Sequence, residues 1–322
     1  MTAVLTTRHY TEHVLAELRE RFPGVEFARL GREGEIPAQV AQADVLLRCT
    51  MSKPELSAVL AAVPTIRWIH SCTAGFDQLL VPEISERGLL VTRSGESHHI
   101  QIAEWAIAGL LALAKQFPYA IRAQEEKRWI GPSGWELPVE LFGSTMGIIG
   151  AGAIGTEIAK RAKAFGMTVI GTKRTPSPLP GYDEVLASDQ IERLLRESDF
   201  LVVACPLTSE TRGMLGAEQL AMMKPTAYIS NIARGAIFDE PALIAALEAG
   251  TIAGAALDAF VTEPLPPDDP IWTTRNVLVT PHASGRSAAS NARAHQEFIA
   301  NLERYLRGET LRYPLGDPAL GY

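Results

Sequence analysis

A glycine-rich turn between a short apolar run and an amphipathic segment constrains the fold of this chain most. The stretch from Thr145 to Arg174 reads TMGIIGAGAIGTEIAKRAKAFGMTVIGTKR. Its apolar run Met146 to Ile149 predicts a buried strand, and apolar residues at helical spacing after the glycines predict a helix that ends at Gly166. Met167 to Gly171 predicts a second strand. This order of strand, glycine turn, helix and strand is the setting in which a GxGxxG motif binds a dinucleotide.

The three glycines of the motif have separate physical roles. Gly150 permits the tight turn out of the strand, Gly152 lets the backbone approach a pyrophosphate, and Gly155 lets the helix pack closely on the strand. The N–H groups at the start of the helix, at Ala153 and Ile154, favour phosphate through hydrogen bonds and the helix dipole. The motif alone would also fit a glycine-rich turn in an ordinary α/β protein, but the surrounding strands and helix favour dinucleotide binding.

The end of the second predicted strand indicates which dinucleotide is bound. NAD-binding versions of the motif place an acidic residue there for the ribose hydroxyls, whereas this chain has Thr172, Lys173 and Arg174. Lys173 and Arg174 would attract a 2′-phosphate, and a guanidinium can bind it bidentately. The sequence therefore predicts that NADP(H) is preferred. NAD(H) stays an alternative, because both cations could be solvated loop residues.

The composition is that of a globular protein and disfavours several classes of function. With 322 residues the chain is long enough for two domains, and its net charge of −7 disfavours a nucleic-acid or anionic-membrane partner. The most apolar helix candidate, Ile100 to Phe117, contains Glu104 and Lys115 and is shorter than the about 20 residues that span a bilayer. No signal-peptide pattern is present, so we expect a cytoplasmic protein.

The three cysteines do not form a metal-binding pattern. Cys49, Cys72 and Cys205 are widely spaced, and each lies at or near the end of a predicted strand. We therefore expect buried free thiols, no bound metal and a reducing compartment.

The order of predicted elements indicates two domains with parallel sheets. Residues 1–99 alternate helical segments with five strand candidates: Ala3–Thr6, Val25–Ala28, Val45–Arg48, Ile66–His70 and Leu89–Thr92. Six strand candidates follow later: Met146–Ile149, Met167–Gly171, Phe200–Ala204, Ala227–Ser230, Ile252–Leu257 and Val277–Val279. Residues 120–144 are predicted to be a loop, and Ala288 to Leu306 is predicted to be the last helix. Six strands suit a full doubly wound dinucleotide fold.

Polar side chains follow three predicted strands of the second part and should face one crevice, because ligands bind at the carboxyl ends of parallel strands. A dehydrogenase of 2-oxo acids needs a cation for the carboxylate and carbonyl, a proton donor near neutral pH and a group that favours the protonated donor. Arg234, His282 and Glu263 suit these roles in that order. Each also has an ordinary alternative: a strand-end ion pair, a core histidine, and a cap or solvated loop residue.

Together these stretches resemble the D-isomer-specific 2-hydroxyacid dehydrogenase family over nearly the whole chain. The motifs that carry the resemblance are TAGFD at residues 73–77, IAE at 102–104, GIIGAGAIG at 147–155, CPLTSET at 205–211, NIARG at 231–235, LDAFVTEP at 257–264 and TPH at 280–282. The ordered set of Arg234, Glu263 and His282 is far more specific than the glycine motif.

The resemblance implies two doubly wound α/β domains, with a Rossmann cofactor domain (residues 100–287) inserted into a flavodoxin-like substrate domain (residues 1–99 with 288–322). Family members are typically homodimers. Arg234 would bind and polarise the substrate, His282 would be the acid/base and Glu263 its partner. Backbone N–H groups around Ala74 and Gly75 would hold the substrate carboxylate.

The resemblance also implies a set of cofactor contacts, with Asp258 at the nicotinamide carboxamide. The expected cofactor-binding residues are Gly150, Gly152, Ala153, Ile154, Gly155, Lys173, Arg174, Cys205, Pro206, Thr211, Ile232, Ala233, Arg234, Asp258, His282, Ser284 and Gly285.

The chain departs from the family pattern at two places. Lys173 stands where the family usually has an acidic residue, which resembles the NADP-using glyoxylate/hydroxypyruvate reductases. His98 and His99 precede the helix that starts near Ile100, where the family has fewer histidines. One of them could contact the substrate, and a solvated helix start is the alternative.

The sequence thus predicts an NAD(P)-dependent dehydrogenase that reduces a small 2-oxo acid, of the glyoxylate or hydroxypyruvate type, with NADPH. One alternative is an NAD(H)-using dehydrogenase of another 2-hydroxy acid. A second is a non-catalytic dinucleotide sensor, like the corepressors of the same family. The intact set of Arg234, Glu263 and His282 favours an enzyme.

Overall fold

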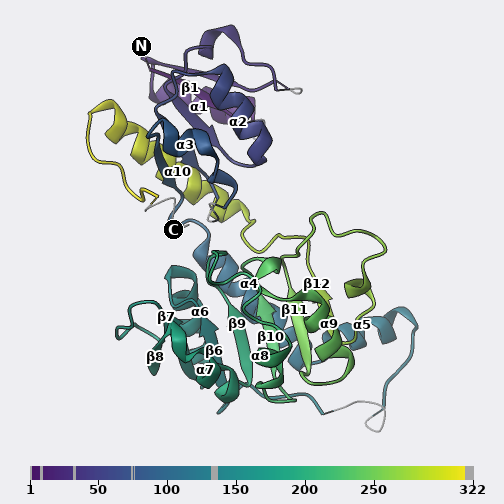
Figure 1. Ribbon diagram of the computed structural model, residues 1–322. Helices are drawn as coiled ribbons and strands as arrows, with labels where there is room; N and C mark the ends of the chain where they lie inside the picture. The colour runs from purple at the N-terminus through teal and green to yellow at the C-terminus, as the bar shows by residue number, and fades with distance from the viewer. Residues whose placement is uncertain are drawn as a thin grey trace. The chain divides into compact units, whose positions relative to one another are not determined.

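The chain divides into two compact units. The computed structural model describes residues 2–7, 10–31, 34–73, 75, 77–131 and 137–315. One unit is Met1–His98 with Ser287–Tyr322, and the other is His99–Arg286, so the second unit is inserted between two parts of the first (Figure 1). The expected junctions at residues 99–100 and 287–288 lie one residue from these boundaries.

The described part of the first unit contains a five-stranded parallel sheet in the order β2-β1-β3-β4-β5. This is the order of the flavodoxin-like doubly wound fold, as predicted. The strands are β1 (Thr2–Thr6), β2 (Val25–Arg29), β3 (Val45–Arg48), β4 (Trp68–Ser71) and β5 (Leu90–Arg93). The fourth begins two residues later than the sequence predicted.

Helices cover both faces of this sheet, because alternate strand residues point to opposite sides. Leu46 and Ile69 pack against α2, whereas Leu47 and Trp68 pack against α1 and α10. The helices are α1 (Glu12–Arg21), α2 (Lys53–Ala62), α3 (Pro82–Glu86) and α10 (Ala288–Leu306), with short 3-10 helices η1 (Ala38–Val40) and η2 (Asp77–Leu79). The Phe298 ring stacks on Trp68 with 5.9 Å between ring centroids, so the end of the chain completes this core.

The second unit contains a larger parallel sheet in the order β12-β11-β10-β9-β6-β7-β8. Its strands are β6 (Thr145–Ile149), β7 (Thr168–Lys173), β8 (Glu184–Ala187), β9 (Phe200–Val203), β10 (Tyr228–Asn231), β11 (Gly254–Leu257) and β12 (Val277–Val279). Counted along the chain, the first six have the spatial order 3-2-1-4-5-6 of the doubly wound dinucleotide fold.

The prediction of six strands here was wrong by one, because β8 was missed. Its four residues EVLA form a sheet edge with one buried side chain, Leu186. Such a short, half-exposed strand after a proline-rich loop has too few apolar positions to show a period.

The prediction of a loop over residues 120–144 was wrong at its start, where α5 forms. The interdomain helix candidate ends at Ala114, and Gln116 takes a left-handed backbone conformation with φ of 57°. Pro118 lies in the first turn of the next helix, where its missing N–H needs no partner. The helices of this unit are α4 (His99–Ala114), α5 (Phe117–Glu125), α6 (Ala153–Ala164), α7 (Ile191–Glu197), α8 (Ala217–Ala221) and α9 (Glu240–Glu248), with 3-10 helices η4 (Ser188–Gln190), η5 (Gly235–Ile237) and η6 (Pro270–Trp272).

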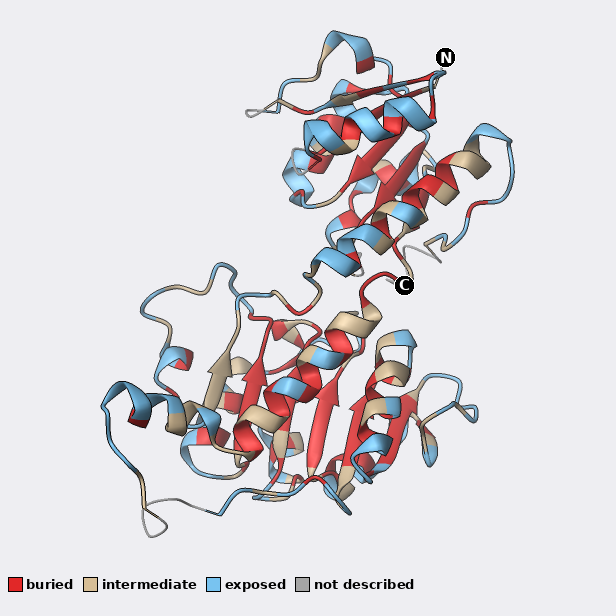
Figure 2. Ribbon diagram, turned by 180° about the vertical axis from the view of Figure 1, so that it is seen from behind, coloured by how far each residue is buried: buried red, intermediate tan, exposed pale blue. Residues whose placement is uncertain are grey.

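Figure 2 shows that the strands of both sheets are largely buried, while the outer faces of the helices are exposed. Helix α4 packs against α6, β10 and β11, and eight of its sixteen residues are buried, which explains its apolar composition. In the described parts of the chain, no helix is both long and apolar enough to cross a membrane.

Candidate active site

The glycine turn after β6 has the geometry that its sequence predicts. Gly150 has a φ of +102°, and a Cβ there would lie 2.7 Å from the backbone N of Cys205. A Cβ on Gly155 would lie 2.4 Å from the carbonyl O of Gly150, so α6 packs directly on the turn. A Cβ on Gly152, in contrast, would meet nothing within 4 Å. The turn is therefore tight where the chain folds back and open where a phosphate would approach.

The N-terminus of α6 is arranged to receive an anion. Gly152 is the N-cap and supplies no side-chain cap, so the first-turn N–H groups have no such partner among the described residues. Ala153 is exposed and Ile154 is half-buried. A pyrophosphate group therefore fits this end of the helix both sterically and electrostatically.

Two cations stand at the carboxyl end of β7, next to this turn in the sheet. Lys173 is the last residue of the strand, pairs with Ala187 of β8 and is half-buried, and Arg174 follows it and is exposed. The preceding Thr172 is buried. The charge at this strand end is therefore positive.

A backbone contact brings the turns after β10 and β11 together. Gly235 follows Arg234, and a Cβ on Gly235 would lie 2.1 Å from the carbonyl C of Phe260. Asn231 braces the first turn: its side chain accepts from the Ala233 N–H at 3.1 Å and donates to the Arg234 carbonyl at 3.1 Å. Arg234 Nη1 donates to the Ala233 carbonyl at 2.7 Å, so the guanidinium end of the side chain lies beside the turn after β10.

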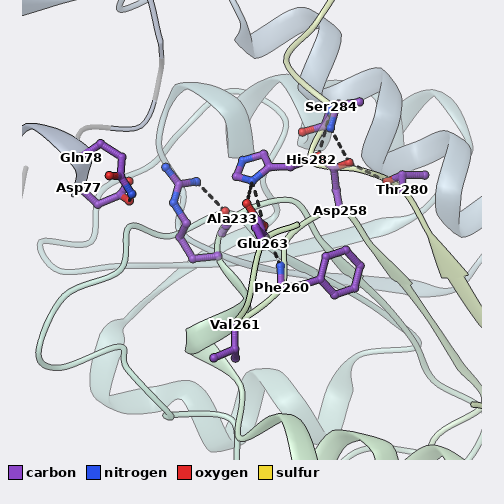
Figure 3. A network of polar contacts seen from close by, with 12 residues as sticks. Asp77, Gln78, Ala233, Asp258, Phe260, Val261, Glu263, Thr280, His282 and Ser284 are labelled. Carbon is purple, nitrogen blue, oxygen red and sulfur yellow. Dashed lines mark hydrogen bonds and ion pairs between the residues drawn. The ribbon is translucent and has the colours of Figure 1, made fainter. Parts of the chain in front are cut away.

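His282 and Glu263 are hydrogen-bonded at this end of the sheet (Figure 3). The imidazole Nδ1 lies 2.8 Å from Oε2 and 3.0 Å from Oε1 of the carboxylate, and Oε1 also accepts from the Phe260 N–H at 2.9 Å. Because Nδ1 is engaged by the carboxylate, Nε2 is the nitrogen left for a ligand. The imidazole is 41% exposed, so it is open to solvent and solutes.

The pKa of Glu263 is lowered from its ordinary value. Burial opposes ionisation, but the hydrogen bonds from His282 and the Phe260 N–H, together with the charges of His282 and Arg234, outweigh it. The carboxylate thus stays ionised beside the imidazole.

A buried carboxylate fixes the loop that carries His282. Asp258 Oδ1 accepts from the Thr280 hydroxyl at 2.6 Å and from the Ala283 N–H at 2.9 Å, and Oδ2 accepts from the Ser284 N–H at 2.9 Å (Figure 3). Asp258 is only 2% exposed. His282 itself has a φ of 48°, a left-handed conformation that is unfavourable for a non-glycine residue. The Asp258 bonds on both sides of His282 hold it in this conformation.

Sequence reasoning missed one supporting residue, Trp105. Its indole N–H donates to the Thr280 hydroxyl at 3.2 Å, which extends the Asp258 network into α4. A cavity of about 10 Å³ lies beside this contact and is lined by Trp105, Ser230, Asp258, Thr280 and apolar neighbours. The sequence signal for this residue was a tryptophan within an otherwise apolar helix, because a buried tryptophan needs a hydrogen-bond acceptor.

The other predicted residues lie at the same strand ends or in the first unit. Ile232 and Ala233 are buried after β10, Cys205 is buried after β9, and burial raises the pKa of the Cys205 thiol to about 12. Pro206 accepts at its carbonyl from the Thr211 hydroxyl at 2.7 Å. Ser284 is buried at its bond to Asp258, and Gly285 follows it.

The predicted substrate loop follows β4 in the first unit. The Gly75 carbonyl accepts from the Thr73 hydroxyl at 3.0 Å, and Ala74 lies outside the described residues. His98 Nε2 contacts the Cys72 carbonyl at 2.6 Å, which gives this histidine a structural partner. Among the described residues, no group of three or more His, Cys, Asp or Glu is placed to hold a metal ion.

The sheet order and the glycine turn are those of an α/β dinucleotide-binding domain. The NAD binding domain model of D-isomer specific 2-hydroxyacid dehydrogenases matches residues 107–284. A glyoxylate reductase from Korarchaeum cryptofilum is 34% identical over 326 residues, which cover 95% of this chain and 93% of that protein. The chain therefore belongs to the D-isomer specific 2-hydroxyacid dehydrogenase family, whose members are NAD(P)-dependent oxidoreductases.

Solved structures agree with this assignment along the whole chain. A D-isomer specific 2-hydroxyacid dehydrogenase from Xanthobacter autotrophicus, in complex with NADPH and MES, is 30% identical with a TM-score of 0.84 and covers 100% of this chain and 99% of that one. An NADPH-dependent glyoxylate/hydroxypyruvate reductase from Sinorhizobium meliloti, in complex with NADP and malonate, is 26% identical with a TM-score of 0.83 and covers 99% and 98%. The predicted family and fold class are thus confirmed.

Proposed function

We propose that this dehydrogenase reduces a small 2-oxo acid, of the glyoxylate or hydroxypyruvate type, and prefers NADPH. The observation that carries the proposal is the exposed His282 imidazole, paired at 2.8 Å with the Glu263 carboxylate beside the turn that bears Arg234. The names of the Korarchaeum and Sinorhizobium relatives support the substrate class.

The residues of the second unit have complementary roles in this reaction. When bound, the reduced nicotinamide supplies a hydride to the ketone carbon. The Arg234 guanidinium binds the substrate carboxylate and stabilises the charge that forms on the carbonyl oxygen. His282 donates the proton on Nε2 to that oxygen, and Glu263 at Nδ1 orients the ring and stabilises the imidazolium before transfer.

Each of the two units contributes binding groups in this proposal. We assign the dinucleotide to the second unit, at the open Gly152 turn and the N-terminus of α6. We assign the substrate carboxylate to backbone N–H groups around Ala74 and Gly75 in the first unit. The remaining cofactor contacts of this proposal are those inferred from the family motifs, including Cys205, Pro206, Thr211 and Gly285.

The preference for NADPH rests on Lys173 and Arg174 at the end of β7. Both would attract a 2′-phosphate at the place where an acidic residue would instead accept bonds from a 2′-hydroxyl. The NADPH and NADP complexes of the two solved relatives agree with this choice.

We further propose that the enzyme is a homodimer. Five large apolar side chains are exposed on α5 and the segment after it: Phe117, Ile121, Trp129, Leu137 and Phe142. Trp129 is 94% and Leu137 91% exposed, so a partner of similar apolar character would stabilise this surface. Trp135, the other tryptophan of the segment, lies outside the described residues.

Steady-state oxidation of NADPH and NADH by the purified protein tests the proposal, with glyoxylate, hydroxypyruvate, pyruvate and a bulkier 2-oxo acid as substrates. Faster turnover with NADPH and one of the two smaller acids is expected. Equal or faster turnover with NADH would refute the cofactor preference alone. The variant His282→Ala should lose the chemical step but keep NADPH affinity, and unchanged turnover in this variant would refute the mechanism.

A further inference from the structure

Two cysteines are opposite each other at the carboxyl ends of β3 and β4. These strands pair in parallel with Arg48 opposite Ser71, so Cys49 and Cys72 occupy the next register position. The Cys72 N–H donates to the Arg48 carbonyl at 2.8 Å, which extends the ladder to this pair. Neighbouring strands lie about 4.8 Å apart, within the span of about 4.4–6.8 Å between Cα atoms that a disulfide bridges. Residues paired across these two strands are therefore within the span that a disulfide bridges.

The side chains of this pair meet a tyrosine. The Tyr10 hydroxyl lies 2.9 Å from Cys72 Sγ, and each of the thiols of Cys49 and Cys72 shifts the pKa of the other. Both cysteines are free thiols. The backbone of Cys49 is also fixed, because its N–H donates to the Thr7 hydroxyl at 3.1 Å. The two thiols are thus neighbours at the end of paired strands, and one of them contacts Tyr10.

The two thiols differ in exposure and acidity. Cys49 is half-buried and Cys72 is buried. The hydrogen bond with Cys72 lowers the pKa of Cys49 against the effect of burial, with help from Tyr10, Thr7 and the charge of Arg48. The hydrogen bond with Cys49 and burial raise the pKa of Cys72. Cys49 is thus the better nucleophile and the thiol that a small oxidant reaches first.

We propose that Cys49 and Cys72 form a reversible dithiol–disulfide pair whose oxidant is a peroxide. The Cys49 sulfur attacks one peroxide oxygen, the O–O bond breaks, and Cys49 becomes a sulfenic acid while the other oxygen leaves as water. Cys72 Sγ then attacks the Cys49 sulfur, the S–S bond forms, the S–O bond breaks and a second water leaves with the Cys72 proton. Two thiols are oxidised and one hydrogen peroxide is reduced. A small dithiol such as dithiothreitol reverses the change.

Oxidation at this pair acts on the loop that follows β4. The Cys72 carbonyl contacts His98 Nε2 at 2.6 Å, and the Ser71 and Thr73 hydroxyls lie 3.0 Å apart. Thr73 in turn donates to the Gly75 carbonyl. A disulfide would tie the start of this loop to the end of β3 and remove the thiol protons from the Tyr10 contact. Since the proposed function places the substrate carboxylate at Gly75, oxidation should raise the KM for the oxo acid more than the KM for NADPH.

Thiol mapping tests the pair directly and does not depend on turnover. Native protein is treated with increasing hydrogen peroxide, denatured in N-ethylmaleimide and analysed by intact mass and peptide mapping. The expected product loses two hydrogens and contains one peptide that links Cys49 to Cys72, and dithiothreitol restores the starting mass. The Cys205→Ser variant should give the same product, whereas Cys49→Ser and Cys72→Ser should give none.

Two results would overturn the proposal. One is that both Cys49 and Cys72 are still alkylated after the native protein has been treated with peroxide at doses that oxidise free thiols. The other is a disulfide between chains or to Cys205 in place of the predicted one. Circular dichroism of each variant confirms that the fold is native.

Kinetics then test the effect on the loop. The oxidised wild type should show a KM for glyoxylate raised by roughly threefold or more, with the KM for NADPH unchanged, and Cys49→Ser should not respond to peroxide. If the mapped disulfide forms and both KM values stay unchanged, the pair stands and the placement of substrate at Gly75 fails.

Discussion

Replacement of Asp258 by alanine should release the loop that holds His282. The carboxylate accepts three hydrogen bonds, from the Thr280 hydroxyl and the Ala283 and Ser284 N–H groups, at 2.6, 2.9 and 2.9 Å. These bonds flank His282, whose φ of 48° is unfavourable without them. In Asp258→Ala the three donors lose their acceptor, and His282 is free to return to an ordinary backbone conformation.

The magnitude follows from the number of bonds and the burial of the carboxylate. Each hydrogen bond to a charged acceptor contributes about 1.5–3 kcal/mol, and the cost of burying the charge, several kcal/mol, offsets much of their sum. The net loss should be about 2–4 kcal/mol, mostly as local opening of residues 280–286. A displacement of the imidazole by about 1 Å lowers kcat/KM by about 100-fold.

Two measurements on Asp258→Ala check this reasoning: kcat/KM from NADPH oxidation, and amide hydrogen exchange at Ala283 and Ser284. Both should change, with much faster exchange at the two amides. Asp269→Ala is the matched control, since that aspartate accepts a single backbone N–H, from Ile271 at 2.9 Å. A kcat/KM within twofold of wild type, together with unchanged exchange, would refute the idea that Asp258 holds the loop. A selective loss of NADPH affinity would instead favour the contact with the nicotinamide inferred from the family.

Four further variants test other parts of the structure. Gly155→Ala should lower the free energy of unfolding by about 1–3 kcal/mol, and the thermal midpoint with it, because its Cβ would lie 2.4 Å from a backbone carbonyl. An unchanged midpoint would contradict the close packing. Lys173→Glu should lower the ratio of kcat/KM for NADPH over NADH by about 10- to 100-fold, and a constant ratio would dismiss the 2′-phosphate argument. Because the pKa of Glu263 is lowered in the fold, its ionisation stabilises the protein above the unfolded-state pKa of about 4.3, and this contribution disappears as pH falls through the lower folded value. Urea unfolding should thus show Glu263→Gln less stable than wild type near neutral pH, with the gap closing in acid; a gap that persists would disprove the linkage. Phe298→Ala should cost about 3–5 kcal/mol in urea unfolding of the first unit, since the ring is fully buried, and a loss below about 1 kcal/mol would show that the site collapses.

Features that depend on local chain geometry could be predicted from the sequence. Gly150 and Gly155 were assigned their roles from spacing alone, and each is now seen at a contact that excludes a Cβ. The bounds of β3 and α10 were predicted correctly, because both are bordered by clear turn or cap residues and carry strong apolar patterns. The order of the strands in each sheet is that of the two doubly wound folds that the family resemblance implied.

Features that depend on tertiary contacts could not be predicted. The edge strand β8 gains its conformation from pairing with β7, not from its own four residues. The break at Gln116 depends on a left-handed residue that no glycine or asparagine marks. Asp258 was expected to face the cofactor, and its bonds to the His282 loop arise between residues up to 26 positions apart. Polar networks of this kind have no periodic signature, so their partners are known only once the fold is known.

The insertion of one unit within the other has a consequence for biosynthesis. The face of the first sheet that holds Trp68 is covered by Phe298, and the whole second unit, His99–Arg286, lies between these two residues in the sequence. During synthesis, the second unit would therefore be complete before α10 is made. Until then, the part of the β1, β3 and β4 face that α10 covers would stay exposed. During that interval the nascent chain presents an apolar surface that chaperones bind. Translation that stops before Ser287 should leave a folded inserted unit attached to an incomplete and aggregation-prone first one.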